Sequence, residues 1–423
     1  MSKIKSMTKS ARPIVFEEEK SWRRPEIKEA VVDGIFQSEK FRAFIKSTFD
    51  HAEVNVSSVS ETAGFLKLFL RQNMGLDDAF MNVEFASYLA ELAKFQADSI
   101  HAAEIYFKDK KPNPKAVKWP DPTGHIGEGS IYDTVPVVEN YGIIDKSTPI
   151  GSAGSCFAVE IAKNLMERDF NYVVKEKSSD PETGRVTADV DPYNPVVQYS
   201  CAWGVLFNSP SFKQIAEKAF GERNLPPLLV KIGKGMYADP FRESAGFPSA
   251  RSFERDSIKH INATREALLE CEVFVITLGL NECWEYIPDG SVISRNPSSS
   301  ELLTLLRHRT LTVQENVDSI QRFLDIVRVH NPKMKLILSV SPVPFIATGR
   351  ADKYHVVTAN GHSKAVLRVA AEQLAETNKD VFYFPSYEMV TMCTKEPWAE
   401  DQRHISQKGV ANVMKLFDAM FVK

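Results

Sequence analysis

The sequence has no long hydrophobic run and almost no net charge. None of its 423 residues belongs to an apolar stretch of about 18 residues, so we expect no membrane-spanning helix. Its 52 Lys and Arg nearly balance its 55 Asp and Glu, giving a net charge of −3. Nucleic-acid binding usually needs a clustered basic surface, so no nucleic-acid partner is expected. The basic start of the chain is followed by no apolar run of roughly 7–15 residues, and no signal peptide is predicted.

Cysteine is also scarce. The chain has five cysteines, an odd number, and no pair has the Cys-x-x-Cys spacing. Neither a disulfide framework nor a zinc ribbon is therefore predicted, and we expect a cytoplasmic protein with reduced thiols. No group of His, Cys and carboxylates has metal-ligand spacing, and no glycine-rich phosphate loop is present. We expect no required cofactor.

The composition is that of a globular protein, with 43% hydrophobic and 25% charged residues. The length is sufficient for two domains. Phe85, Leu89 and Leu92 recur at helical spacing, which predicts a helical N-terminal region over residues 1–110. Residues 111–140 are rich in proline and glycine. Because proline fixes φ and removes a donor, this stretch is predicted to be a linker rather than a continuous helix.

Residues 141–423 alternate between strand-like and helix-like patterns. Short apolar runs of buried-strand character occupy 273–278, 335–340 and 381–384. Apolar residues at helical spacing fill 314–328, 363–376 and a last segment after Ser406, a predicted N-cap. This alternation predicts an α/β fold, a three-layer α/β/α sandwich with a parallel sheet. Ligands of such sheets bind at the carboxyl ends of the strands.

Residues suited to chemistry follow three strand-like segments. Gly154, Ser155 and Cys156 form a turn before a helical pattern, where the positive end of the helix dipole favours a thiolate and backbone N–H groups can bind an oxyanion. A purely structural turn explains these residues equally well. Gly279 lets the backbone leave a strand, and Asn281 can aim an amide at developing negative charge or bond its own turn.

The third segment lies just before the last helix. Asp401 stands three residues ahead of His404, and a carboxylate at this spacing can orient an imidazole and stabilise its cationic form. An Asp-x-x-His pair by itself is common by chance, so it gains meaning only beside the other two segments.

Together and in this order, the three segments resemble the SGNH, or GDSL-like, hydrolase superfamily. Within it, the chain is similar to the GSCFA family, whose name stands here as residues 154–158. Further stretches similar to that family are 193–195 (Tyr-Asn-Pro), 277–284, 339–343 and 383–388. The resemblance covers about two thirds of the chain and leaves out roughly the first 140 residues.

The resemblance implies a nucleophile in the first turn. Laying Gly154 on the Gly of the superfamily's Gly-Asp-Ser motif places Ser155 at its Asp and Cys156 at its nucleophilic Ser. We prefer Cys156 as the nucleophile, which a reducing compartment permits, and Ser155 takes this role if the turn is shifted by one residue.

The other matching blocks imply the remaining roles. Asn281 is the expected oxyanion donor beside Gly279, His404 the general base and Asp401 its orienter. The superfamily's second-block glycine is not clearly present, and Gly204 or backbone near Asn194 are the alternatives for that donor.

Four further residues receive weaker predictions. Glu282 and Trp284 match the family pattern but suit a buried salt bridge and a wall of the site. His355 and His362 fall in a predicted loop that could line a substrate cleft, although solvated histidines are the simpler interpretation.

The resemblance implies acyl transfer through a covalent acyl-enzyme, with a small-molecule or glycan substrate. Water as acceptor makes the protein an esterase, and a sugar hydroxyl makes it an O-acyltransferase. A cysteine nucleophile favours a thioester donor such as acyl-CoA and a polysaccharide-building role. A different class is a non-catalytic protein that binds a ligand at the turn and docks a partner enzyme. The N-terminal helices are candidates for a lid, a partner dock or a homo-oligomer interface.

Overall fold

The computed structural model describes residues 117–423, apart from 126, 138, 188–198, 243–244, 295–296 and 298. By its internal contacts the chain divides into Met1–Val117 and Lys118–Lys423, a boundary inside the predicted linker. The helices predicted over residues 1–110 and the block at 193–195 lie outside the described residues. In the described part of the linker, the only helical turn is the 3-10 turn η2 (Ile131–Asp133).

A parallel sheet forms the centre of the second unit. Its strand order is β1-β6-β10-β11, and all three pairings are parallel. The strands are β1 (Ile150–Gly154), β6 (Val273–Leu278), β10 (Lys335–Val340) and β11 (Val381–Phe384). Tyr172 adds a parallel bridge to Ile150, outside the named strands. The α/β fold with a parallel sheet is thus confirmed, with three strands at their predicted bounds.

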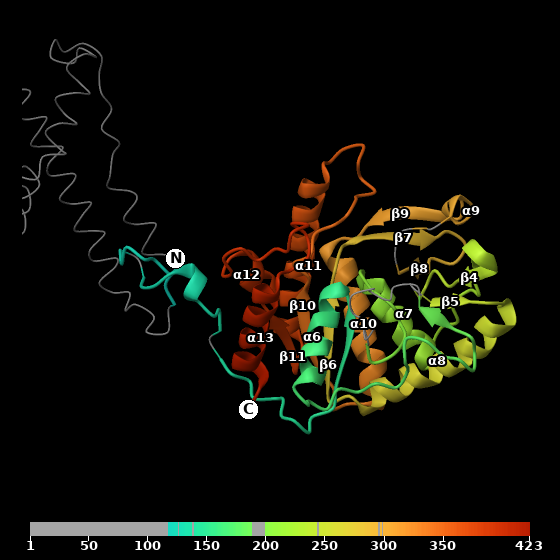
Figure 1. Cartoon of the computed structure of the whole chain (residues 1–423), viewed down its shortest axis with the longest axis horizontal. Helices are drawn as coiled ribbons and strands as arrows, with labels where there is room; N and C mark the ends of the chain where they lie inside the picture. Colours follow the sequence, from blue (N-terminus) through green and yellow to red (C-terminus); the bar gives the residue numbers. More distant parts are fainter. Residues whose placement is uncertain are drawn as a thin grey trace, which may run out of the picture. The chain divides into compact units, whose positions relative to one another are not determined.

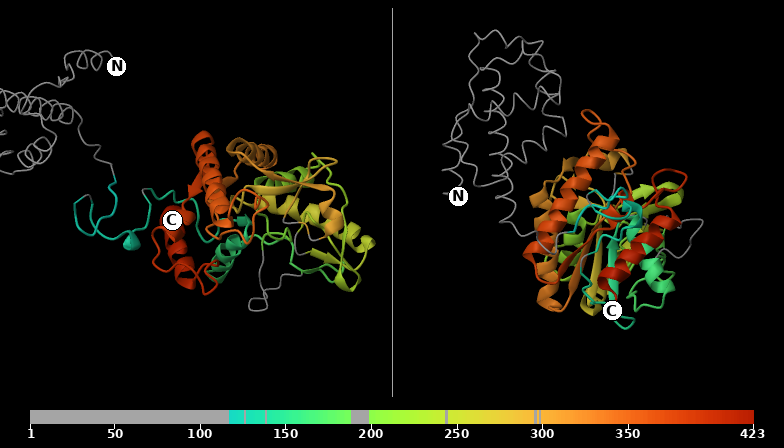
Figure 2. Two further views of the ribbon diagram at one scale, coloured as in Figure 1. Left: turned by 90° about the horizontal axis from the view of Figure 1, so that it is seen from above. Right: turned by 90° about the vertical axis from the view of Figure 1, so that its left-hand side faces the viewer.

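Helices pack against both faces of this sheet (Figures 1 and 2). One face, with Phe274 and Ile276, packs against α7 (Ser209–Ala219), α8 (Ala250–Glu270), α10 (Val313–His330) and α11 (Val356–Thr377). The other, with Val273 and Val275, packs against α6 (Cys156–Glu167), α12 (Ser386–Thr391) and α13 (Gln407–Phe421). Successive residues of a strand point to opposite faces, so one apolar strand supplies both cores.

Capping residues set the helix starts that the sequence suggested. Ser406 is the N-cap of α13, and its hydroxyl accepts from the Gly409 N–H at 3.2 Å, as predicted. Thr312 and Glu315 form a capping box at the start of α10.

Two smaller antiparallel sheets, not predicted from the sequence, complete the unit. The first has the strand order β2-β5-β4-β3. Its strands are β2 (Val186–Thr187), β5 (Ala245–Phe247), β4 (Met236–Ala238) and β3 (Val230–Ile232). The 3-10 turn η3 (Gly233–Gly235) connects β3 to β4. The other has the order β8-β7-β9, from β8 (Val292–Ile293), β7 (Glu282–Tyr286) and β9 (Leu306–Thr310), with α9 (Ser300–Leu303) before β9. Because β7 follows β6 closely in the chain, this second sheet extends beyond the carboxyl ends of the parallel strands (Figure 1).

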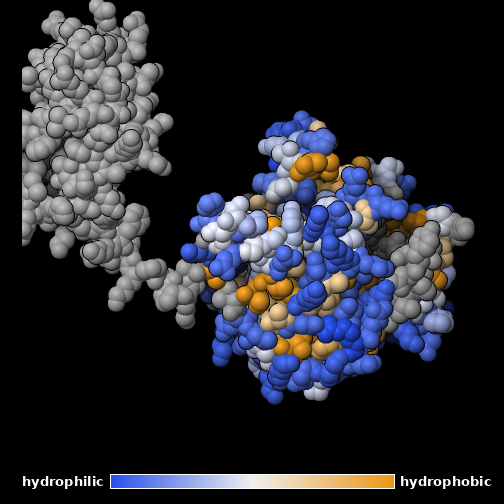
Figure 3. Space-filling view, turned by 60° about the vertical axis from the view of Figure 1, so that its left-hand side comes forward, coloured by the Kyte–Doolittle hydropathy of each residue, from blue (hydrophilic) through white to orange (hydrophobic). Residues whose placement is uncertain are grey.

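One face of the unit is mostly polar. Figure 3 shows this face, with separate hydrophobic patches between the polar side chains. Within the described residues, no helix is long and apolar enough to cross a bilayer. The segment that directly follows the linker is fixed to the chain's C-terminus. There the Tyr141 N–H donates to the Met420 carbonyl at 2.7 Å, and the Lys423 N–H donates to the Ile144 carbonyl at 3.0 Å.

Candidate active site

The turn after β1 holds the first predicted site residues. Ser155 is the N-cap of α6, and Cys156 is the first residue of that helix. The Ser155 hydroxyl makes no capping bond, although the side chain is only 1% exposed. Gly154 is required here, because a Cβ at this position would lie 2.7 Å from the Thr277 carbonyl oxygen. The lack of a side chain lets β1 and β6 run close together where the turn begins.

Buried polar atoms without partners gather at the carboxyl edge of the sheet. Among the described residues, six buried side-chain oxygens have no hydrogen-bond partner, and four of them lie at the ends of β1, β6 and β10: Ser155 Oγ, Thr277 Oγ1, Asn281 Oδ1 and Ser341 Oγ. The register places these ends side by side, since Thr277 pairs with both Gly154 and Ser339. Unsatisfied buried polar groups are costly and rare in native proteins. Their concentration at one edge marks this edge as the candidate site.

Residues 199–208, here called the strap, connect the ends of β1 and β6. The Leu206 N–H donates to the Gly154 carbonyl at 2.9 Å, and the Phe207 carbonyl accepts from the Gly279 and Leu280 N–H groups at 2.9 Å each. A Cβ on Gly279 would lie 2.9 Å from the Phe207 ring, so only glycine allows this approach. The strap thus joins Gly279, a predicted site residue, to the turn that carries Ser155.

Gly204 lies inside the strap, two residues before the bond to the end of β1. Its φ of 70° is in the left-handed region that favours glycine. The hydroxyl of Tyr199, also in the strap, donates to the Ser155 carbonyl at 3.3 Å. Gly204 thus belongs to a strap that is bonded to the Ser155 turn on both sides of it, at Tyr199 and Leu206. Backbone near Asn194, the other alternative for the second oxyanion donor, lies outside the described residues, and this donor stays a prediction.

Asn281 is completely buried, at 0% exposure. Its backbone N–H donates to Ser363 Oγ at 2.8 Å, and its side-chain Nδ2 donates to the Leu311 carbonyl at 2.9 Å. The Leu311 N–H in turn donates to the Asn281 carbonyl at 2.7 Å. These bonds fix the loop after β6, while Oδ1 is left without a partner. The oxyanion role of Asn281 stays a prediction.

Asp401 and His404 form a hydrogen-bonded pair before α13. His404 Nδ1 lies 2.5 Å from Asp401 Oδ2, and the backbone N–H groups of His404 and Arg403 donate to Asp401 Oδ1 at 2.9 and 3.1 Å. These backbone bonds, together with the His404 ring, lower the pKa of Asp401 to about 2. Asp401 is therefore ionised at neutral pH, the state in which it can orient an imidazole.

Arg403 connects this pair to the sheet edge. Its guanidinium donates to the Pro344 carbonyl at 3.3 Å and lies 3.0 Å from His404 Nε2. Pro344 follows closely after Ser341, so the Asp401–His404 loop lies against the segment that leaves β10. When His404 Nε2 accepts a hydrogen bond from Arg403, the ring proton of the neutral imidazole is on Nδ1, where it faces Asp401. No hydrogen bond joins His404 to the Ser155 hydroxyl, which has no partner among the described residues.

Lys364 is a buried cation that the sequence analysis missed. It is 1% exposed, and its Nζ donates to the Gly279 carbonyl at 2.7 Å and to the Val343 carbonyl at 2.9 Å. It thus ties the loop after β6 to the loop after β10. A single lysine in a helical pattern is usually a solvated residue, so the sequence carried no signal for this role.

The weaker predictions fall around the same loops. Glu282 is buried and accepts from Thr348 Oγ1 at 2.7 Å and the Gly349 N–H at 2.9 Å, with His308 Nε2 at 3.2 Å. Burial acts to raise the pKa of Glu282, but these three partners outweigh it and lower the pKa. The half-buried Trp284 ring packs edge-on against His308. Glu282 therefore anchors the loop after β10, close to the predicted salt-bridge role.

His355 and His362 were expected in a loop, but they belong to α11 (Val356–Thr377), His355 as its N-cap and His362 within it. Both are exposed and distinct from the pair at 401–404. His355 is the N-cap of α11, and its Nδ1 accepts from the Val357 N–H at 3.3 Å. His362 lies 3.2 Å from the Arg350 guanidinium. Neither is bonded to the strap or to the turn after β1.

The described residues show no candidate metal centre, and one small cavity lies away from the turn after β1. In the described residues, no group of three or more His, Cys, Asp or Glu side chains is placed to hold a metal ion. A cavity of about 20 Å³ lies between α7 and α8, lined by Lys218, Arg242, His260 and mostly apolar residues. That volume suits a single water molecule rather than a substrate.

Comparisons with known proteins give one family and several distant structures. Residues 149–417 match the GSCFA family. No curated protein matches the chain. A carbohydrate esterase family 3 protein from Talaromyces cellulolyticus is 9% identical with a TM-score of 0.32, and covers 64% of this chain and 94% of its own. The family 3 carbohydrate esterase of Clostridium thermocellum is 12% identical with a TM-score of 0.28 and the same coverage. An acetyl xylan esterase from the rumen bacterium Butyrivibrio proteoclasticus is 13% identical with a TM-score of 0.27, covering 65% of this chain and 64% of its own.

Proposed function

Because the chain belongs to the GSCFA family, we propose that it is an SGNH-like acyl-transfer enzyme acting on acylated carbohydrates. The observation that carries this proposal is the cluster of unpartnered buried oxygens at the ends of β1, β6 and β10, with the Asp401–His404 pair tethered to the same edge. The carbohydrate follows from the resemblance to the SGNH superfamily, whose substrates are commonly O-acyl groups on carbohydrates and lipids. The helices on both faces of the sheet suit the three-layer sandwich of that superfamily.

Cys156 is the proposed nucleophile. The Ser155 hydroxyl is enclosed, with its side chain 1% exposed, so an acyl donor has no open path to it. Cys156 is the first residue of α6, a helix of 12 residues, and the positive end of the helix dipole favours a thiolate there. The alternative with Ser155 requires the turn to open.

The proposed reaction has two halves. His404 Nε2 leaves Arg403 and takes the thiol proton of Cys156, while Asp401 stabilises the resulting imidazolium. The sulfur attacks the acyl carbonyl, and N–H groups of the Gly204 strap and the Asn281 loop hold the oxyanion. As the intermediate collapses, the bond to the leaving alcohol or thiol breaks and that group takes the proton from His404. Water or a sugar hydroxyl then gives its proton to His404 and attacks the thioester. The carbon–sulfur bond breaks, and the Cys156 sulfur takes the proton back from His404 to restore the thiol.

The test measures turnover with p-nitrophenyl acetate, acetylated xylo-oligosaccharides and acetyl-CoA, with and without a free oligosaccharide acceptor. His404→Ala is expected to lower kcat by about 10²–10⁴-fold, the range of general base catalysis. His362→Ala is the matched control, since it removes another exposed histidine that lies beside an arginine. Equal activity of the two variants would contradict the proposal.

One observation favours a second candidate function. His404 Nε2 is engaged by Arg403, and the Ser155 hydroxyl is enclosed, an arrangement that a non-catalytic ligand-binding protein could also have. Binding of a glycan without turnover of any ester or thioester would support this alternative.

A further inference from the structure

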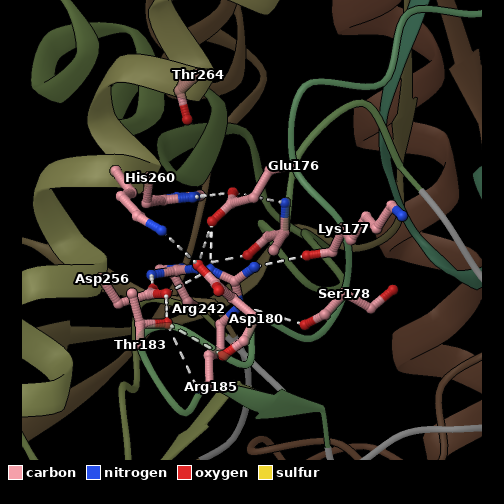
Figure 4. Close-up of polar contacts among 12 residues, drawn as sticks. Glu176, Lys177, Ser178, Asp180, Thr183, Arg185, Arg242, Asp256, His260 and Thr264 are labelled. Atoms are coloured by element: carbon pink, nitrogen blue, oxygen red, sulfur yellow. Dashed lines mark hydrogen bonds and ion pairs between the residues drawn. The ribbon is translucent and has the colours of Figure 1, made fainter.

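A buried ionic network is bonded to the strap at Ala202. Figure 4 shows the side chains of this network. The network consists of Glu176, Arg185, Arg242, Asp256 and His260, whose side chains are at most 8% exposed. Asp256 lies 2.6 Å from each of the two arginines, and Glu176 lies 2.6 Å from His260 Nδ1 and 3.4 Å from Arg242. Glu176 also pairs with Arg185.

Such a network is expensive to bury. Replacing buried ion pairs by apolar residues of similar volume is often neutral or stabilising, so stability alone is a weak reason for five buried polar groups. A fully satisfied buried polar network also rigidifies the groups bonded to it and fixes their geometry.

The charges of the network balance at neutral pH. Burial lowers the pKa of His260 to about 4, helped by the Arg242 charge and opposed by Glu176, so the ring is neutral. Burial acts to raise the pKa of Glu176, but His260, Arg242 and Arg185 outweigh it and hold this pKa well below its usual range. Two carboxylates thus face two guanidinium groups around a neutral imidazole.

Two members of the network hold the strap by its backbone. The Ala202 N–H donates to Glu176 Oε2 at 3.0 Å, and Arg242 Nε donates to the Ala202 carbonyl at 3.2 Å. Both peptide groups around Ala202 are therefore fixed by buried, charged partners. Charge-assisted hydrogen bonds of this kind are about twice as strong as neutral ones.

The position fixed at Ala202 reaches the candidate site within a few residues. Gly204 follows two residues later, and Leu206 bonds the carbonyl of Gly154 at 2.9 Å, next to Ser155. Trp203, between them, is buried and donates from Nε1 to Thr264 Oγ1 on α8 at 3.0 Å. The strap is thus held by the network at one end and by the strand ends at the other.

We propose that Glu176 and Arg242 are positioning residues that clamp Ala202 and so set the direction of the Gly204 N–H at the Ser155 turn. The consequence for catalysis rests on the proposed function, whereas the clamp itself is a property of the fold. Misplacement of a catalytic group by about 1 Å can lower the rate by about 10²-fold, so a loosened strap is expected to act on kcat.

The network offers two matched pairs of variants. Glu176→Gln and Asp256→Asn each remove one negative charge from a carboxylate that pairs with both arginines, but only Glu176 bonds the strap. Arg242→Lys and Arg185→Lys each keep the positive charge, but only Arg242 donates from Nε to Ala202, while Arg185 Nε donates to the Ser178 carbonyl. The lysine pair keeps the clamp testable where a charge-removing variant fails to fold.

The experiment measures amide hydrogen exchange over residues 199–208 in the full chain, together with kcat and KM for p-nitrophenyl acetate. We expect faster exchange in Glu176→Gln and Arg242→Lys than in Asp256→Asn and Arg185→Lys, and kcat lower by roughly 10–100-fold with KM changed less than about twofold. Equal exchange within each pair would overturn the clamp. A wild type without turnover would defeat the proposed function alone, since the exchange comparison still decides the clamp.

Discussion

Thr277 provides a direct test of the idea that the carboxyl edge keeps polar atoms at the expense of stability. It lies on β6 at 0% exposure, and its hydroxyl has no partner. Valine has nearly the same shape and favours strands, so Thr277→Val removes the hydroxyl without opening a cavity. An unsatisfied buried polar group costs about 1–3 kcal/mol, and the variant is expected to raise the free energy of unfolding by that amount.

Ser339 is the matched control, because it pairs with Thr277 across the sheet and is also fully buried. Its hydroxyl has two partners, the Ser386 hydroxyl at 2.5 Å and the Phe384 carbonyl at 3.1 Å. Ser339→Ala should therefore lower the free energy of unfolding by about 1 kcal/mol, the opposite sign.

The assay is urea unfolding of the full chain at pH 7, followed by tryptophan fluorescence and read from the midpoint at unchanged slope. A loss of more than about 1 kcal/mol in Thr277→Val would refute the reasoning, because it would show that the hydroxyl has a stabilising partner.

Three further predictions use other parts of the site. Gly279→Ala brings a Cβ to 2.9 Å from the Phe207 ring and should lower the free energy of unfolding by about 1–3 kcal/mol. Gly361→Ala is the control, because a Cβ there meets no neighbouring atom within 4 Å and should not lower the free energy of unfolding. Urea unfolding midpoints compare the two variants. In the native protein at pH 8, iodoacetamide should modify Cys156 and leave the other four cysteines unmodified. Burial raises the pKa of these four thiols, which are Cys201, Cys271, Cys283 and Cys393. Mass spectrometry of the peptides identifies the modified residues. The pKa of His260 falls from 6.5 to about 4 on folding, so the unfolded chain binds the proton first, and stability should drop as the pH falls from about 6.5 to 4. The full drop is about 3.5 kcal/mol at about 1.4 kcal/mol per pKa unit. Urea midpoints at pH 7 and 5 should differ less in His260→Gln than in the wild type.

The sequence predicted the parallel sheet well because buried strands are continuous apolar runs. The segments 273–278, 335–340 and 381–384 form β6, β10 and β11 at the predicted bounds. The helix predicted over 314–328 extends over Val313–His330, where the capping box fixes its start. Local chemistry is sufficient for such elements.

The small antiparallel sheets were not predicted, because strands of two or three residues such as β2 and β3 have no measurable periodicity. The packing of the site was also outside the reach of the sequence. Nothing local shows that Lys364 bonds two loop carbonyls, or that Glu176 and Arg242 meet at Ala202. These contacts join residues far apart in the chain, and they exist only once the sheet has brought the segments together.

The central claim, an acyl-enzyme at the turn after β1, is tested most directly by intact-protein mass spectrometry. The wild type, Cys156→Ala, Ser155→Ala and His404→Ala are quenched in acid during reaction with p-nitrophenyl acetate or acetyl-CoA. We expect one acetyl group on the wild type and on Ser155→Ala, none on Cys156→Ala, and slower acetylation of His404→Ala. An acetyl group lost only in Ser155→Ala would move the nucleophile by one residue. No acetyl group and no turnover with either donor would contradict the account.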